Sequence, residues 1–183
     1  MSDSNLPTLG TPVKNLILPA NITGPAVKAI NNLVTIDEGG WHLEHVDGDN
    51  DGGWTFGGMT SKLFCTYFPN YAGYDAIEKV VNDPKLYLVL IAECQAIYYQ
   101  EFYVPVSRIM YSTVVFPGHL SCAINVGMSR FAMLYAATKN APYKDFLSAW
   151  KDFYFSLLRD NPVDDIKFIH GWINRVWNHL GEI

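Results

Sequence analysis

Hydrophobic residues recur three or four positions apart over most of the chain after residue 70, which is the spacing of one face of an α-helix. The pattern predicts helices over five segments: 74–82, 85–103, 120–138, 143–158 and 163–180. The second is expected to stop before Pro105, because proline cannot donate the helical hydrogen bond. The third is small and apolar almost all round, which predicts burial on every side.

The first part of the chain shows a different pattern. Residues 1–24 hold three prolines and two glycines and have no amphipathic period, which predicts an extended arm. Helical spacing begins at Pro25, since proline is tolerated in the first turn, and it ends at Gly39-Gly40. We therefore expect a helix over 25–38 and one domain over 25–183.

Residues 39–60 are rich in glycine and acid: they include seven glycines and four acidic residues. This composition suits loops and a short hairpin rather than a helix. The expected fold class is therefore mainly α, with a small Gly-rich β element near the N-terminal side.

Composition narrows the class of protein. Of the 183 residues, 49% are hydrophobic and only 17% are charged, which excludes a disordered chain and a coiled coil. The net charge of −5 argues against a nucleic acid partner, because phosphate binding needs a surplus of Lys and Arg. No apolar run approaches the roughly 20 residues of a membrane span, so no membrane partner is expected.

Cysteine usage and the N-terminus indicate where the protein is made. Cys65, Cys94 and Cys122 are odd in number and form no C-x-x-C pair, which fits a reducing cytoplasm. The first residues lack the basic and apolar regions of a signal peptide.

The segment with the clearest chemistry begins at Glu38. This residue closes an amphipathic helix, where partial desolvation would raise the pKa of its carboxyl group. Asp47 follows nine residues later across the Gly-Gly turn, so the chain can bring a second carboxylate to face the first. Two carboxylates across a cleft are the usual requirement of glycoside hydrolysis. Thr55 adds a hydroxyl that could hold a water molecule.

The motifs around these residues resemble glycoside hydrolase family 108, the phage and bacterial N-acetylmuramidases. The first motif is Glu38-Gly39-Gly40, an acidic stretch, and then Gly52-Gly53-x-Thr55-x-Gly57. Two weaker matches follow in the right order: Ala123-Ile124-Asn125-Val126-Gly127 resembles V-N-x-G, and Gly171-Trp172-Ile173-Asn174-Arg175 resembles G-W-x-N-R. The resemblance covers about residues 26–178.

The resemblance implies a lysozyme-like helical domain that cleaves the β-1,4 bond between N-acetylmuramic acid and N-acetylglucosamine, without a cofactor. Glu38 would be the general acid. Asp47 would stabilise the transition state or, with Thr55, position the water. The substrate-binding residues would be Trp41 and Trp54, which could stack on sugar rings, and Asn125, which would line the cleft and hydrogen-bond the substrate or brace Glu38. Trp172, Asn174 and Arg175 are interpreted as packing residues and a local salt-bridge site.

The chain departs from the family pattern in its acidic loop. Trp41 replaces the usual tyrosine, and the loop is about three residues longer, so that Asp47, Asp49 and Asp51 all stay open as the second carboxylate. We prefer Asp47 for its distance from Glu38. The same stretch, 47–52, matches the first half of a calcium loop but lacks the closing glutamate, and no metal is expected. A zinc site at His42, Glu44, His45 and Asp47 has no supporting motif.

Three functions follow as hypotheses. The first is a phage-type muramidase, made in a bacterial host cytoplasm, that acts on the cell wall after release as an endolysin or as a virion component. The second is a structural or binding module of a phage assembly with lost or altered activity. The third is a lytic transglycosylase, which needs only one acid. The expected partners are peptidoglycan glycan strands, together with a virion or a second copy of the chain that would bind the arm of residues 1–24.

Overall fold

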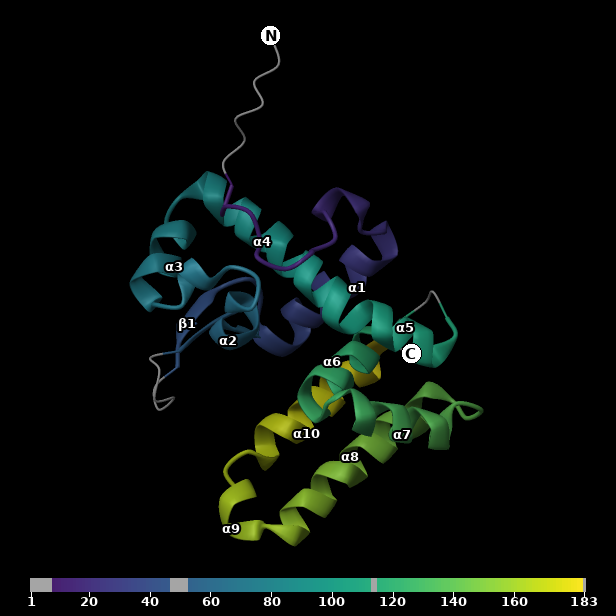
Figure 1. Ribbon diagram of the computed structural model, residues 1–183. Coiled ribbons are helices and arrows are strands. Elements are labelled where there is room, and N and C mark those ends of the chain that lie inside the picture. The colour runs from purple at the N-terminus through teal and green to yellow at the C-terminus, as the bar shows by residue number, and fades with distance from the viewer. Residues whose placement is uncertain (1–7, 47–52, 113–114, 183) are drawn as a thin grey trace.

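The computed structural model describes residues 8–46, 53–112 and 115–182, and it consists mainly of helices with one small antiparallel sheet (Figure 1). The elements of the N-terminal half are η1 (Pro19–Asn21), α1 (Gly24–Glu38), β1 (Leu43–His45), β2 (Trp54–Phe56), β3 (Met59–Thr60), α2 (Ser61–Cys65), η2 (Pro69–Tyr71), α3 (Tyr74–Val81) and α4 (Pro84–Tyr98). Those of the C-terminal half are a π-helical turn, η3 (Tyr99–Tyr103), then α5 (Val104–Met110), α6 (Pro117–Val126), α7 (Met128–Thr138), α8 (Tyr143–Asp160), α9 (Pro162–Asp165), α10 (Ile169–Asn178) and η4 (His179–Glu182). The predicted class, mainly α with a small β element towards the N-terminal side, is confirmed.

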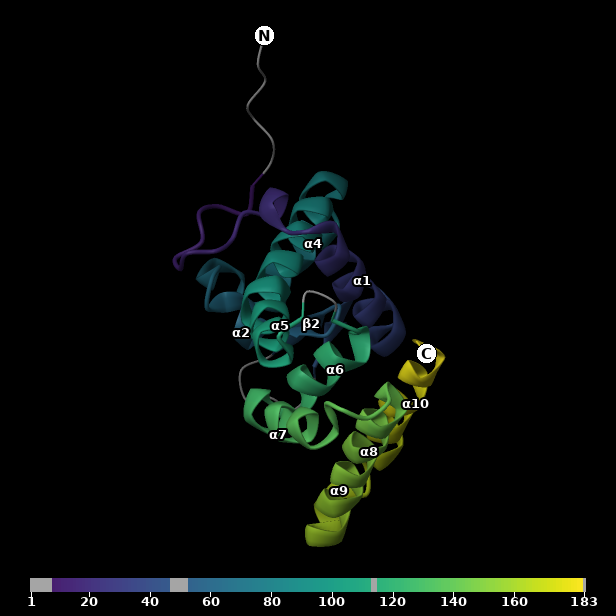
Figure 2. The same ribbon diagram turned by 90° about the vertical axis from the view of Figure 1, so that its right-hand side faces the viewer.

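A long rod made of α4, η3 and α5 crosses the molecule, and one group of elements lies near each of its ends (Figures 1 and 2). The sheet, α2 and α3 lie near the first part of the rod, and helices α6 to α10 form the second group. Helix α1 connects the groups, because Val34 and Glu38 lie against the turn between β2 and β3, and the helix also packs against α6 and α10. The C-terminal end of α1 therefore lies where the groups meet.

Helix α1 follows the sequence prediction closely. It spans Gly24–Glu38, has Pro25 in its first turn, and buries its apolar face through residues such as Ile30 and Val34. Its end is set by Gly39 and Gly40, which have φ values of 70° and 116° that a residue with a Cβ rarely adopts. The Gly40 N–H donates to the Val34 carbonyl at 3.1 Å, so the chain turns sharply away immediately after Glu38.

The sheet has the order β1-β2-β3 with both pairs antiparallel. Glu44 pairs with Thr55, and Thr55 also pairs with Thr60. Gly57 and Gly58 form the tight turn between β2 and β3, with φ values of 53° and 76°. This hairpin turn is the part of the sheet that meets the end of α1.

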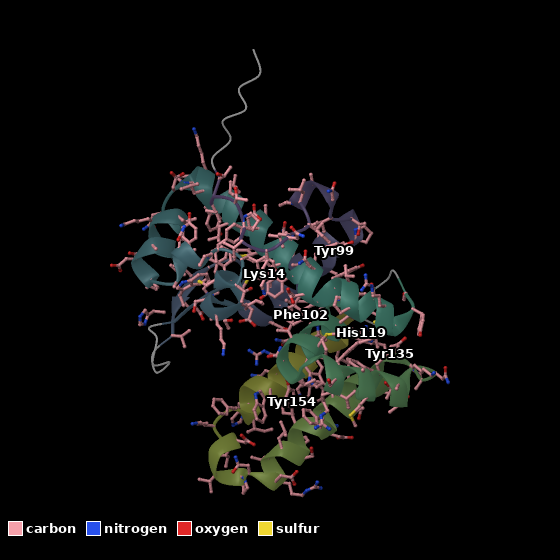
Figure 3. The ribbon with its side chains drawn as sticks, in the orientation of Figure 1. Lys14, Tyr99, Phe102, His119, Tyr135 and Tyr154 are labelled. Atoms are coloured by element: carbon pink, nitrogen blue, oxygen red, sulfur yellow. The ribbon has the colours of Figure 1, made fainter. Side chains whose placement is uncertain are left out.

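The second group of elements is built around aromatic rings. His119 on α6 is buried and lies 4.6 Å from Phe146 and 4.9 Å from Tyr143 between ring centroids, with Tyr135 on α7 at 5.9 Å. Figure 3 shows His119 and Tyr135 together between α6 and α7, and Tyr154 further down beside α10. This core fixes α8 and α10 relative to α6.

Three predicted helix boundaries are wrong. The helix expected to stop before Pro105 continues through it, because the π turn has Val104 N–H donate to the Tyr99 carbonyl, and this wider turn accommodates the proline ring. The segment 120–138 is two helices separated at Gly127, whose φ is 82°, and only the first is mostly buried. The segment 163–180 is divided into α9, α10 and η4.

The N-terminal arm packs on its own chain over residues 8–22. Leu9 is buried, and its carbonyl accepts a hydrogen bond from the Tyr71 hydroxyl at 3.2 Å. The Val13 N–H donates to the Tyr67 carbonyl at 2.9 Å, and the Ile17 N–H donates to Gln100 Oε1 at 3.1 Å. This part of the arm is therefore integral to the domain that was expected to begin at residue 25.

None of the helices in the described residues is long and apolar enough to cross a membrane.

Candidate functional site

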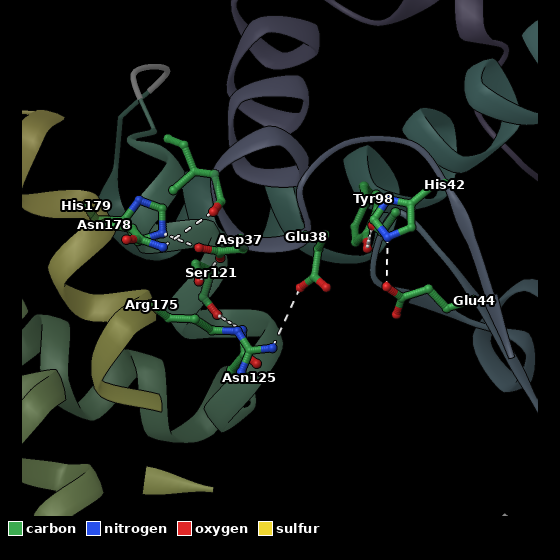
Figure 4. A network of polar contacts seen from close by, with 12 residues as sticks. Asp37, Glu38, His42, Glu44, Tyr98, Ser121, Asn125, Arg175, Asn178 and His179 are labelled. Atoms are coloured by element: carbon green, nitrogen blue, oxygen red, sulfur yellow. Dashed lines mark hydrogen bonds and ion pairs between the residues drawn. The ribbon is translucent and has the colours of Figure 1, made fainter. Parts of the chain in front are cut away.

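Glu38 is the last residue of α1, and its carboxyl group lies over the turn between β2 and β3. A Cβ placed on Gly58 would lie only 2.7 Å from both Cγ and Cδ of Glu38. The carboxyl group also faces α10. Arg175 Nη2 on that helix lies 3.8 Å from Glu38 Oε1. Figure 4 shows Glu38 between Arg175 on one side and the pair His42 and Glu44 on the other.

The surroundings of Glu38 raise the pKa of its carboxyl group. Burial is the largest cause, because it disfavours the charged form. The Arg175 guanidinium opposes this effect, whereas the negative charges of Asp37 and Glu44 add to it, and His42 lowers the pKa slightly. The side chain is nevertheless 27% exposed, so the carboxyl group is desolvated but open to a ligand.

Asp37, the neighbour of Glu38, is held by a buried polar network. Its side chain is 2% exposed, and Oδ1 lies 3.1 Å from Nε2 of the fully buried His179. Ser121 on α6 donates to Asp37 Oδ2, and Asn178 donates to the Ile36 carbonyl at 3.4 Å (Figure 4). The end of α1 is thereby fixed to α6 and to the C-terminal end of α10, which limits the positions that Glu38 can take.

The other side of the site is fixed by Trp41. Its indole N–H donates to Asn31 Oδ1 at 3.2 Å, and its ring lies 5.7 Å from that of Phe56. A Cβ on Gly57 would lie 2.5 Å from this ring, so the hairpin turn packs directly on it. The buried Tyr98 hydroxyl donates to the Gly57 carbonyl at 3.0 Å, which holds the turn from below.

The exposed face of the sheet carries polar groups. Trp54 and Phe56 are buried, so Thr55 between them lies on the opposite face, beside its cross-strand partner Glu44. Glu44 Oε1 lies 2.7 Å from Nε2 of His42, and both side chains are about half exposed. The negative charge of Glu44 thus lies near enough to raise the pKa of the Glu38 carboxyl group.

The three predicted substrate-binding residues, Trp41, Asn125 and Trp54, differ in how far they are exposed. Trp41 is half-buried and packs on Gly57, next to the glycine that faces Glu38. Asn125 is exposed on the last turn of α6, and its amide donates to the Ser121 carbonyl at 2.9 Å, so it adjoins the buried network. The prediction that Trp54 stacks on a sugar is wrong: the side chain is 1% exposed and its N–H donates to the Tyr71 carbonyl at 2.8 Å.

The acidic stretch 47–52 lies outside the described residues. The choice among Asp47, Asp49 and Asp51 as the second carboxylate therefore stays a prediction, as does the reading of this stretch as an incomplete calcium loop. Within the ranges that the structure describes, no group of three or more metal-binding side chains is present.

Two residues of the site are not predicted from the sequence to act with Glu38. The sequence predicts a local salt bridge for Arg175, but the partner of Arg175 is Glu38 itself. The only sequence signal was its place in the motif Gly171–Arg175, because the two residues are 137 positions apart. The sequence offers Glu44 only as a zinc ligand, whereas the structure places it opposite Thr55 in the sheet; its alternation with Leu43 along a short strand is the signal for this position.

Comparison with known proteins found no match for this chain, whether among protein-family models, curated proteins or solved structures.

Proposed function

We propose that this protein is a glycoside hydrolase that acts on the peptidoglycan glycan strand, with Glu38 as the general acid. The observation that carries the proposal is the state of Glu38: a partly exposed carboxyl group whose pKa is raised mainly by burial. A carboxylic acid that keeps its proton towards neutral pH is what a glycosidic oxygen needs when the bond breaks.

The mechanism assigns a separate task to each neighbour. Arg175 limits the rise in the Glu38 pKa and holds one carboxylate oxygen, so that the group can also give up its proton. The second carboxylate would stabilise the positive charge that develops on the sugar, or would activate water with Thr55. Asp47 is the residue proposed for this role, with Asp49 and Asp51 as alternatives.

The choice of peptidoglycan rests on the resemblance of the Glu38–Gly57 motif to glycoside hydrolase family 108. This resemblance supports cleavage between N-acetylmuramic acid and N-acetylglucosamine by an endolysin or a virion component. The proposal does not depend on whether the arm of residues 1–24 binds a virion or a second copy of the chain.

Purified peptidoglycan treated with the protein provides the test. The parent should release new reducing sugar ends, and Glu38→Gln should reduce this rate at least about 10²-fold, as removal of a general acid does. Glu93→Gln is a matched control, since Glu93 on α4 is also partly buried with a raised pKa, and its rate should stay within about twofold.

Product masses separate hydrolysis from transglycosylation. A product with a free reducing N-acetylmuramic acid supports the hydrolase, whereas a 1,6-anhydro product would show a lytic transglycosylase. No product from the parent, with the fold intact, would instead favour the structural module.

A further inference from the structure

Four residues of the last helix lie on one stripe that leads away from Glu38. Phe168, Trp172, Arg175 and His179 are spaced four, three and four residues apart, so they fall within one narrow sector of α10 and its two ends. Arg175 and His179 contact Glu38 and Asp37. Trp172 and Phe168 therefore lie on the same face, about 4.5 Å and about 10 Å from Arg175 along the helix axis, at 1.5 Å per residue.

The rings on this stripe form a stack that reaches the surface. The buried Tyr154 on α8 lies 5.0 Å from Trp172 with an interplanar angle of 16°, and Trp172 lies 5.8 Å from Phe168 at 23°. The outermost ring, Phe168, is 48% exposed. Its position is fixed by packing from below, so a ligand would meet a preformed aromatic surface.

A cation accompanies the outer ring. Lys167 Nζ lies 4.9 Å from the centroid of Phe168. An aromatic face packs against the C–H groups of a pyranose, and a nearby ammonium group can pair with a carboxylate on the same sugar or on its substituents. The combination suits a glycan that carries carboxylate groups.

We propose that Phe168, supported by Trp172, is a second contact for the glycan strand, one or more sugars away from the bond that Glu38 would cleave. This inference rests on the proposed function for the identity of the glycan. It goes further in requiring a strand long enough to extend from Glu38 to the N-terminal end of α10.

The test is equilibrium binding in the inactive Glu38→Gln background, so that no substrate is consumed. The probe is soluble glycan strands of six or more sugars, prepared from peptidoglycan by removal of the stem peptides. Phe168→Ala should raise the Kd about fivefold, whereas Phe168→Tyr, which keeps the ring, should bind within about twofold of the parent.

Phe155→Ala is the matched control. Phe155 lies on α8, is 47% exposed and has no ring partner among the described residues, so its removal should leave the Kd within about twofold. Thermal melting of each variant confirms that the fold is intact. An equal Kd for the alanine variants of Phe168 and Phe155 would overturn the proposal.

Two further outcomes separate this proposal from others. A change of oligomeric state in Phe168→Ala with an unchanged Kd would assign the ring to a protein contact and would overturn the glycan contact. Phe168-dependent binding by the Glu38→Gln protein, together with no release of sugar ends by the parent, would support the glycan contact and overturn the proposed hydrolase function.

Discussion

Gly58 lies directly beneath the carboxyl group of Glu38, and a Cβ at this position would lie 2.7 Å from two of the Glu38 side-chain atoms. The same glycine has a φ of 76°, because it closes the tight turn between β2 and β3. Gly58 therefore satisfies a backbone requirement and also leaves the space in which Glu38 lies. The position of the proposed acid depends on a residue with no side chain.

Gly58→Ala should impair activity more than stability. The new methyl group would displace the Glu38 carboxyl group, and a shift of about 1 Å at a reacting group can lower kcat about 10²-fold. The positive φ should also cost about 1–2 kcal/mol of unfolding free energy. The release of reducing ends and urea unfolding measure these two effects.

Gly10→Ala is the control for the backbone effect alone. Gly10 has a φ of 95°, and a Cβ there would meet nothing within 4 Å. This variant should lose a similar unfolding free energy and keep its kcat within about twofold. An equal loss of kcat in both variants would mean that the Glu38 position is not what Gly58 controls.

Arg175→Gln should move the alkaline limb of the pH–rate profile. The guanidinium is the strongest influence that lowers the Glu38 pKa, so its removal should raise that pKa further. A general acid works while it is protonated, so the rate should persist to higher pH than in the parent. Arg159→Gln, at a surface arginine that is 78% exposed, should leave the limb in place. A shift of the Arg175→Gln limb to lower pH would contradict the assignment.

Glu38→Gln should stabilise the protein at neutral pH. The folded-state pKa is raised above the usual 4.5, so ionisation of Glu38 costs stability as the pH rises through that pKa. The neutral amide avoids this cost, which should raise Tm by up to about 3 °C at pH 7. Below the unfolded-state pKa both side chains are uncharged, so the gain should vanish near pH 4. Melting curves at the two pH values decide; a gain at pH 4 as large as at pH 7 would exclude the ionisation effect.

Leu9→Ala should destabilise the protein by about 2–3 kcal/mol, because the side chain is 6% exposed in the core. Leu18→Ala, at a position of the arm that is 67% exposed, should change the unfolding free energy by less than about 0.5 kcal/mol. Urea unfolding of both variants is the measurement. A loss of less than about 0.5 kcal/mol for Leu9→Ala would show that the arm does not contribute to the core.

Local signals predicted the end of α1 well, since proline in the first turn and two glycines after Glu38 act within a few residues of the chain. They failed at Pro105 because a proline is expected to end a helix, whereas the π turn Tyr99–Tyr103 before it accommodates the ring. They also failed at Trp54, because a ring in a glycine-rich segment can equally stack on a sugar or fill a core. Its burial depends on contacts with residues such as Phe64.

The sequence predicted Glu38 of the candidate site but not the residues that contact the end of α1. Glu38 was identified from its place on the helix, and that reasoning also gave the correct direction for its pKa. Arg175, Ser121 and His179 reach the end of α1 from segments more than 80 residues away, so spacing along the chain gives no sign of their contacts. Only the fold brings these side chains together.

The role of Glu38 as the general acid is tested most directly by the dependence of the rate on the leaving group. The first substrate is an oligosaccharide of alternating N-acetylglucosamine and N-acetylmuramic acid with its natural sugar leaving group. The second carries a dinitrophenyl group on its terminal N-acetylmuramic acid, and this group departs without a proton. Glu38→Gln should cleave the first at least about 10²-fold more slowly than the parent and the second within about tenfold of it. Equal losses on both substrates would contradict the assignment of Glu38 as the acid.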